Sequence, residues 1–243
     1  MRISISGSAG VGKSTLLEAF KKRWPMYLSP TKTYRDVIKE NNLEHSSNTN
    51  GETQLTILDW MMTEQDNYPK GSKVISDRCP LDNLAYTLQG NASDNISDEV
   101  AGATISLVRE AMKGLDIIFW LKRNPKIKIV EDGLRDTDED FIKNTETIFE
   151  DLFNQYMDDL ESDVFFPKDD CPAIICIDES FLTVDDRITF IGEFIDYKGD
   201  LIETTDSILN TENEDILKNL IGDQIDAQEG DDRIKKLVKE FKK

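Results

Sequence analysis

A glycine-rich segment near the start of the sequence constrains the fold more than any other feature. The segment GSAGVGKS, residues 7–14, fits the pattern G-x-x-x-x-G-K-[S/T]. It follows a β-like run at residues 2–6 and precedes an amphipathic stretch at residues 13–24, which predict a strand and a helix. Glycines let the backbone curve around a phosphate group with its N–H groups turned inward, and the start of a helix adds partial positive charge. The segment therefore predicts a nucleoside triphosphate site between a strand and a helix.

We expect this phosphate-binding loop to hold ATP together with Mg²⁺. The lysine of the pattern, Lys13, adds a full positive charge beside the phosphates and is therefore also a candidate catalytic residue. Ser14 supplies the hydroxyl oxygen expected to ligate Mg²⁺. The complete set of predicted nucleotide-binding residues is Gly7, Ser8, Ala9, Gly10, Val11, Gly12, Lys13, Ser14 and Thr15.

Strand-like and helix-like segments alternate along the chain up to about residue 197. After the first strand, strands are predicted at residues 26–30, 73–76, 116–121 and 173–177. Helices are predicted at residues 33–41, 52–67, 81–88, 98–113, 138–160 and 183–195. Strands separated by helices pair in parallel, because a crossover that holds a helix returns the chain in the same direction. The pattern therefore predicts an α/β fold, a three-layer sandwich built on a parallel sheet.

Composition divides the chain into two parts. Residues 1–197 have the pattern of one domain, whereas residues 198–243 are acidic and then basic, which predicts a helical or disordered extension. The net charge of −19 argues against broad binding to nucleic acid, which needs a basic surface. No apolar run approaches the ~18 residues of a membrane span, and the first residues lack the pattern of a secretory signal. We therefore expect a cytoplasmic protein with no membrane partner.

Cysteine and histidine content indicates no metal site. Cys79, Cys171 and Cys176 follow no metal-binding spacing, so we expect reduced thiols. The single histidine, His45, lies in a polar segment that predicts an exposed loop, and we assign it no role.

A second candidate site follows the predicted strand at residues 73–76. Ligands of such sandwiches gather outside the carboxyl ends of the strands, which is where Asp77 and Arg78 stand. Asp77 is expected to hold Mg²⁺ directly or through water, and Arg78 to grip the acceptor or the transferred phosphoryl group. Asp82 comes one helical turn later and is positioned to hold Arg78 in place.

Positive charge gathers after the predicted strand at residues 116–121, in an otherwise acidic chain. Cations that close over a nucleotide neutralise the charge that develops during phosphoryl transfer, and closure excludes water. We therefore predict a lid over about residues 122–137. Its candidate cations are Lys122, Arg123, Lys126, Lys128 and Arg135, the last as a catalytic residue.

With these three segments the chain resembles the P-loop kinases of nucleosides and nucleotides. It is most similar to the AAA-labelled small kinases, which include nicotinamide riboside kinase domains and many phage-encoded relatives. Thymidylate kinases and deoxynucleoside kinases share the first two segments. The resemblance covers about residues 1–196 and implies a five-stranded parallel sheet in the order 2-3-1-4-5, with Mg-ATP as the phosphate donor.

The resemblance also implies roles for individual residues. By position, Lys13 and Ser14 serve ATP and Mg²⁺, and Asp77 serves the metal or the acceptor hydroxyl. Arg78 serves the acceptor or the γ-phosphate, and Arg135 serves the lid.

One departure from deoxynucleoside kinases concerns the general base. Those enzymes place a glutamate after the second strand, whereas here the first acid in that region is Asp36. Either Asp77 or Asp36 takes that role, or the acceptor already carries a phosphate and needs no strong base. In the latter case Arg35 and Lys32 are candidate phosphate grips, although a solvated helix face explains both equally well.

Residues 51–62 contain a candidate for recognition of a base. Gln54 has an amide that can pair with a base edge, and Trp60 has a ring that can stack on one. Core packing explains Trp60 and its apolar neighbours at least as well.

The predicted function is ATP-dependent transfer of the γ-phosphate to a nucleoside, a nucleotide or a nucleoside-like small molecule. One alternative is a phage-type kinase of 5-hydroxymethyluracil in DNA, located in the host cytoplasm; the net charge counts against it. Another is a regulatory P-loop ATPase switch that signals through the C-terminal extension. The sequence is also compatible with a homodimer.

Overall fold

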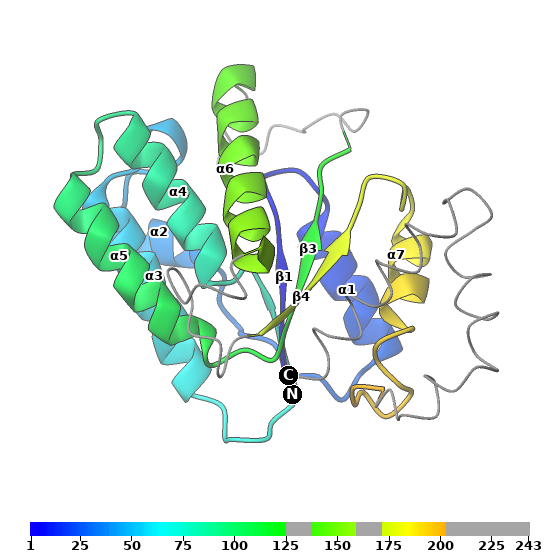
Figure 1. The fold of residues 1–243 in the computed structure, drawn as a ribbon. Coiled ribbons are helices and arrows are strands. Elements are labelled where there is room, and N and C mark those ends of the chain that lie inside the picture. The colour runs from blue at the N-terminus through cyan, green and yellow to red at the C-terminus, as the bar shows by residue number, and fades with distance from the viewer. Residues whose placement is uncertain (125–137, 159–171, 203–243) are drawn as a thin grey trace. The chain divides into compact units, whose positions relative to one another are not determined.

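The computed structural model describes residues 1–124, 138–158 and 172–202 (Figure 1). Met1–Asp200 form one compact unit. A second unit, Leu201–Lys243, contains almost all of the predicted extension and lies almost wholly outside the described residues. No helix in the described ranges is both long enough and apolar enough to cross a membrane.

The described sheet has four parallel strands in the order β2-β1-β3-β4. Their bounds are β1 Arg2–Ser6, β2 Val74–Asp77, β3 Ile117–Leu121 and β4 Ala173–Ile177. The register of β1 and β2 sets Ile5 opposite Asp77 at the carboxyl ends. The predicted parallel α/β sheet is confirmed.

The prediction of five strands is wrong for this structure. In the segment at residues 26–30 only Leu28 pairs, in a single parallel bridge to Val74. The Leu28 N–H donates to the Lys73 carbonyl at 2.9 Å, and the Leu28 carbonyl accepts from the Ile75 N–H at 2.8 Å. Pro30 follows two residues later and has no N–H to donate, so a ladder cannot continue past this point. The described sheet therefore lacks the strand expected at residues 26–30. In its place a single bridge from Leu28 lies at the β2 edge.

Helices cover both faces of the sheet, which makes the predicted three layers (Figure 1). α1 (Lys13–Arg23) and α7 (Val184–Ile191) lie on one face. The other helices lie on the opposite face: α2 (Tyr34–Asn41), α3 (Gly51–Asp66), α4 (Pro80–Ala92), α5 (Asp98–Met112) and α6 (Glu139–Asp158). A short 3-10 helix, Ser46–Asn48, precedes α3.

Successive side chains of β3 pack into two separate hydrophobic cores. Ile117 and Phe119 pack into a cluster with Phe20 of α1, whereas Ile118 and Trp120 pack into a cluster with Phe153 of α6. Successive side chains of a strand point to opposite faces, so a continuous apolar strand must be covered on both sides. The Trp120 ring stacks on the Phe153 ring, with their centroids 4.5 Å apart. Packing on both faces holds the sheet in place, and the candidate site lies at the carboxyl ends of its strands.

Candidate functional site

The phosphate-binding loop joins β1 to α1 with a backbone that only glycine adopts easily. Gly7 has φ +137° and Gly12 has φ +93°, both in the region that L side chains avoid. A Cβ atom on Gly7 would lie 2.5 Å from the carbonyl oxygen of Leu121, so the loop is also too close to β3 for any side chain. The loop therefore turns back over the strand ends and delivers the chain into α1 at Lys13.

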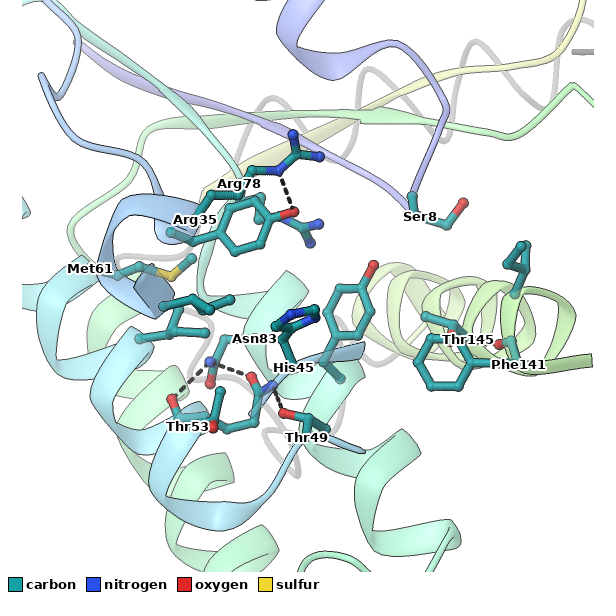
Figure 2. A pocket seen from close by; sticks show the side chains of 17 residues that line it. Ser8, Arg35, His45, Thr49, Thr53, Met61, Arg78, Asn83, Phe141 and Thr145 are labelled. Carbon is teal, nitrogen blue, oxygen red and sulfur yellow. Dashed lines mark hydrogen bonds between the residues drawn. The ribbon is translucent and has the colours of Figure 1, made fainter. Parts of the chain in front are cut away.

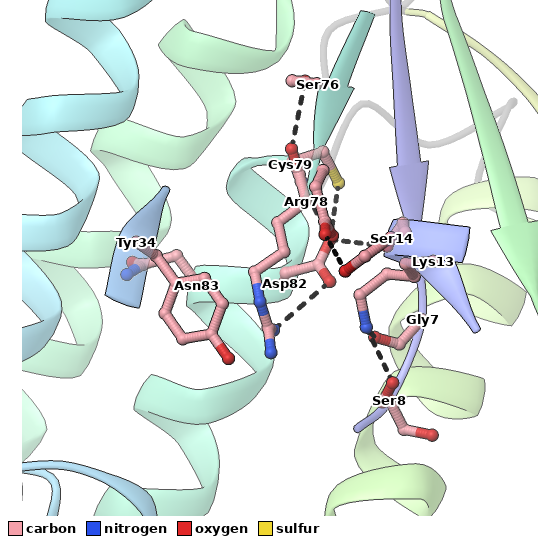
Figure 3. Close-up of polar contacts among 12 residues, drawn as sticks. Gly7, Ser8, Lys13, Ser14, Tyr34, Ser76, Arg78, Cys79, Asp82 and Asn83 are labelled. Carbon is pink, nitrogen blue, oxygen red and sulfur yellow. Dashed lines mark hydrogen bonds and ion pairs between the residues drawn. The ribbon is translucent and has the colours of Figure 1, made fainter. Parts of the chain in front are cut away.

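Lys13 lies inside its own loop. Its Nζ donates to the carbonyls of Gly7 at 2.6 Å and Ser8 at 2.7 Å (Figure 3). Burial and the positive charge of Arg78 lower the pKa of Lys13 to about 8, against the opposing effect of Asp82 and Asp77. The charged form of such a buried lysine is stabilised when the negatively charged phosphates of a nucleotide bind beside it.

Ser14 and Asp77 come together across the paired ends of β1 and β2. The Ser14 hydroxyl donates to Asp77 Oδ2 at 2.6 Å. The other carboxylate oxygen, Asp77 Oδ1, is buried without a hydrogen-bond partner among the described residues. Hydroxyl and carboxylate oxygens are the donors that Mg²⁺ prefers, and Mg²⁺ in kinases needs one or two protein ligands beside phosphate and water. These two residues therefore fit an Mg²⁺ ion carried by a nucleotide.

A strained backbone directs the side chain of Arg78. This residue has φ +84°, and its N–H donates to the Ile5 carbonyl at 2.9 Å. A non-glycine residue in this region of φ costs of order 1–3 kcal/mol and persists where the surroundings enforce it. The guanidinium then lies over the rings of Tyr34 and Tyr86, at 4.2 and 4.9 Å from their centroids.

Asp82 connects β1 to the Asp-Arg turn. It is fully buried, and its Oδ2 accepts from the Ser6 hydroxyl at 2.7 Å and from the Cys79 N–H at 2.9 Å. Its Oδ1 lies 3.5 Å from Arg78 Nη1, the contact that the sequence predicted (Figure 3). One carboxylate thus caps α4, ties it to the end of β1 and faces the Arg78 guanidinium.

Arg187 of α7 braces the phosphate-binding loop, a contact that the sequence did not indicate. It is buried, and its Nη1 donates to the Val11 carbonyl at 2.8 Å while its Nε donates to the Phe181 carbonyl at 3.0 Å. In a trans peptide the carbonyl and the following N–H point in opposite directions. By holding the Val11 carbonyl toward α7, Arg187 turns the Gly12 N–H away from α7. Within the sequence Arg187 is one charged residue of an amphipathic helix, which carries no such signal.

An open cavity of about 800 Å³ adjoins the phosphate-binding loop (Figure 2). The lining residues come from the loop, from α2 to α4 and from α6: Ser8, Ala9, Tyr34, Arg35, Ile38, His45, Thr49, Thr53, Gln54, Ile57, Met61, Arg78, Asn83, Tyr86, Phe141, Ile142 and Thr145. The structure therefore brings Arg35, Gln54 and Arg78 to one cavity.

Both ends of the Gln54 amide have protein partners. Its Nε2 donates to the Thr49 hydroxyl at 2.7 Å, and its Oε1 accepts from Asn83 Nδ2 at 2.8 Å. The same Asn83 Nδ2 donates to the Gln54 backbone carbonyl at 2.9 Å, which fixes the orientation of the Asn83 amide because a carbonyl only accepts. Asn83 Oδ1 is left buried without a partner among the described residues. The Gln54 amide, which the sequence predicted to pair with a base edge, is therefore bound at both ends by Thr49 and Asn83.

The structure also gives the positions of Trp60, Lys32 and His45. Trp60 and Lys32 line a second cavity of about 730 Å³, and Lys32 pairs with Glu40 at 2.8 Å. His45, expected on an exposed loop, is half-buried and lines the first cavity (Figure 2). Trp60 is therefore not in the wall of the first cavity.

At the start of the predicted lid, both described cations contact α6. Lys122 Nζ lies 3.8 Å from Glu150, and Arg123 Nη1 lies 3.5 Å from Glu146. Burial raises the pKa of Glu146, against the opposing effect of Arg123. The remaining candidates Lys126, Lys128 and Arg135 lie outside the described residues.

Comparison with known proteins found a family model and several solved structures. The model of a family described as an AAA domain matches residues 2–159. Deoxyadenosine kinase from M. mycoides, solved with dCMP and dCDP, is 16% identical with a TM-score of 0.57, over 79% of this chain and 97% of that one. NadR protein, in complex with NR, is 16% identical with a TM-score of 0.57, over 84% of this chain and 53% of that one.

Thymidylate kinase from Candida albicans is 18% identical with a TM-score of 0.53, over 84% of this chain and 95% of that one. At these identities the likeness is one of fold. No curated protein matches the sequence significantly.

Proposed function

This chain belongs to the AAA domain family, and its structural neighbours include a deoxyadenosine kinase and a thymidylate kinase. On that premise we propose that it transfers the γ-phosphate of ATP to a nucleoside, a nucleotide or a similar small molecule. The observation that carries the proposal is the junction of two sites: the phosphate-binding loop and an open cavity share Ser8 and Ala9, and Arg78 also lines the cavity.

The phosphate-binding loop binds ATP, the phosphate donor. The Gly12 N–H and its neighbours bind the phosphates, and Lys13 exchanges two loop carbonyls for phosphate oxygens. Ser14 and Asp77 would hold Mg²⁺, which would neutralise negative charge on the phosphates of the nucleotide. Buried donors that are already oriented cost little reorganisation during the transfer.

The acceptor half falls to the cavity. Arg78 stands between loop and cavity, and Asp82, Tyr34 and Tyr86 hold its guanidinium in one place. A fixed guanidinium beside the γ-phosphate stabilises the charge that spreads over the transferred group. Asn83 and Gln54 form the polar wall against which a base or similar ring packs.

The test is transfer of labelled γ-phosphate from Mg-ATP to a panel of nucleosides, nucleoside monophosphates, nicotinamide riboside and DNA containing 5-hydroxymethyluracil, with an acceptor-free control. Label on a small molecule supports the proposal, whereas label only on DNA favours the phage-type alternative. Steady release of inorganic phosphate whatever the acceptor favours the ATPase switch. Lys22→Ala, exposed on the same helix as Lys13, is the matched control for Lys13→Ala.

A further inference from the structure

The charge on the walls of the acceptor cavity runs opposite to that of the whole chain. The chain has a net charge of −19. Yet among the described residues that line the cavity there are two arginines, Arg35 and Arg78, and no aspartate or glutamate. A cavity with this lining attracts anions.

The two arginines also meet at one side chain. Arg35 Nε donates to the Tyr34 hydroxyl at 3.1 Å, and the Arg78 guanidinium lies over the ring of the same tyrosine at 4.2 Å. Burial raises the pKa of Tyr34, but the two guanidinium groups more than offset this and lower it to about 8. Asp82 faces the Arg78 guanidinium from inside the protein at 3.5 Å, and guanidinium groups that line an open cavity suit a phosphate in particular.

The nearby carboxylates are held in other contacts. Asp36 caps α2 and accepts from the Thr33 N–H and hydroxyl, both at 2.8 Å. Asp77 accepts from Ser14 on the metal side. Fully buried Asp82 accepts from Ser6 and Cys79 and pairs with Arg78 at 3.5 Å. None of the three lines the acceptor cavity. A hydroxyl acceptor would therefore meet no carboxylate there to take its proton.

We propose, building on the phosphotransferase function above, that the acceptor is a nucleoside monophosphate whose phosphate binds Arg35 and Arg78. A phosphate monoester has a second pKa of about 6, so its oxygen is already ionised at neutral pH. That oxygen attacks the γ-phosphorus of ATP and forms a new O–P bond. The bond from the γ-phosphorus to the β,γ-bridging oxygen breaks, its electrons leave with ADP, and no proton has to be removed. The products are ADP and a nucleoside diphosphate.

The test compares each nucleoside with its own monophosphate on the full chain, with ADP release and product chromatography as readouts. We expect kcat/KM at least 100-fold higher for one or more monophosphates than for the paired nucleosides. Nucleosides accepted as well as or better than their monophosphates would overturn this inference and leave the phosphotransferase standing. ATP hydrolysis with no acceptor phosphorylated would overturn both.

Variants of α2 provide a second, independent readout. Loss of a charge-assisted contact to phosphate predicts that Arg35→Ala raises KM for the monophosphate by about 10- to 100-fold, with KM for ATP unchanged. Arg35→Lys keeps the charge and should recover part of the loss. Lys39→Ala removes an exposed cation from the same helix, outside the cavity lining, and serves as the matched control. An Arg35→Ala enzyme with unchanged KM for the monophosphate would contradict the assignment.

Discussion

Arg187 is predicted to act on nucleotide binding from outside the phosphate-binding loop. Its guanidinium holds the Val11 carbonyl at 2.8 Å, and this contact sets the direction of the Gly12 N–H. Arg187→Ala removes that constraint together with the bond to the Phe181 carbonyl at 3.0 Å. It also removes a buried positive charge next to Gly12, where a Cβ atom would lie 3.2 Å from Arg187 Nη1.

The size of the effect follows from the bonds that are lost. A hydrogen bond with a charged partner contributes about 1.5–3 kcal/mol, which corresponds to about 10- to 150-fold in a binding constant. Only the bond to Val11 orients the phosphate-binding loop, so we expect the Kd for Mg-ATP to rise within that range. The KM for the acceptor should stay within about twofold, because the acceptor cavity contains no part of α7. Loss of the two hydrogen bonds should also lower the free energy of unfolding.

The assay measures the Kd for Mg-ATP by calorimetry and the KM values for ATP and acceptor separately. Arg187→Lys keeps the charge and one donor group, so it should fall between wild type and Arg187→Ala. Thr189→Ala, on an exposed position of the same helix, is the control for the helix itself. A folded Arg187→Ala protein that is less stable but binds Mg-ATP with unchanged Kd would refute the reasoning and leave Arg187 a purely structural residue.

Three further predictions concern the loop itself. Lys13→Ala should abolish phosphoryl transfer while circular dichroism shows an intact fold, because the charge beside the phosphates is lost. The stability of wild type relative to Lys13→Ala should rise between pH 8 and 10.5 in urea unfolding, because in that range only the unfolded lysine binds its proton. Gly7→Ala should destabilise the protein by about 1–3 kcal/mol or more and weaken ATP binding at least tenfold, since it strains φ +137° and places a Cβ atom 2.5 Å from the Leu121 carbonyl.

Each of these predictions has a result that contradicts it. Normal turnover by folded Lys13→Ala would remove the assignment of the phosphate-binding loop. A stability difference that stays flat from pH 8 to 10.5 would mean that folding leaves the Lys13 proton affinity unchanged. Gly7→Ala with wild-type melting temperature and ATP affinity would mean that the turn tolerates a side chain.

Local patterns in the sequence were sufficient to predict most of the fold. The strands and longer helices follow apolar patterns within a short window, such as the continuous run of β3 or the helical spacing of Phe149, Leu152 and Phe153 in α6. The segment at residues 26–30 has the composition of a strand, but pairing depends on backbone groups that Pro30 interrupts. Strand count is thus decided by contacts with a neighbour, which propensity does not describe.

By itself, the sequence determined where the phosphate-binding loop lies and that Asp77 and Arg78 stand at the carboxyl end of a strand. Those features depend on residues that are contiguous, so their pattern is visible without a fold. Only the tertiary structure decided that Gln54 has its amide bound by Thr49 and Asn83.

The tertiary structure also decided that His45 lines the acceptor cavity and that Arg187 braces the loop. Arg187 and Val11 are 176 residues apart, and no local period relates positions at that distance. Such contacts arise when parallel strands bring remote loops to one edge of the sheet, because the order of the strands and not the order of the residues sets which loops meet.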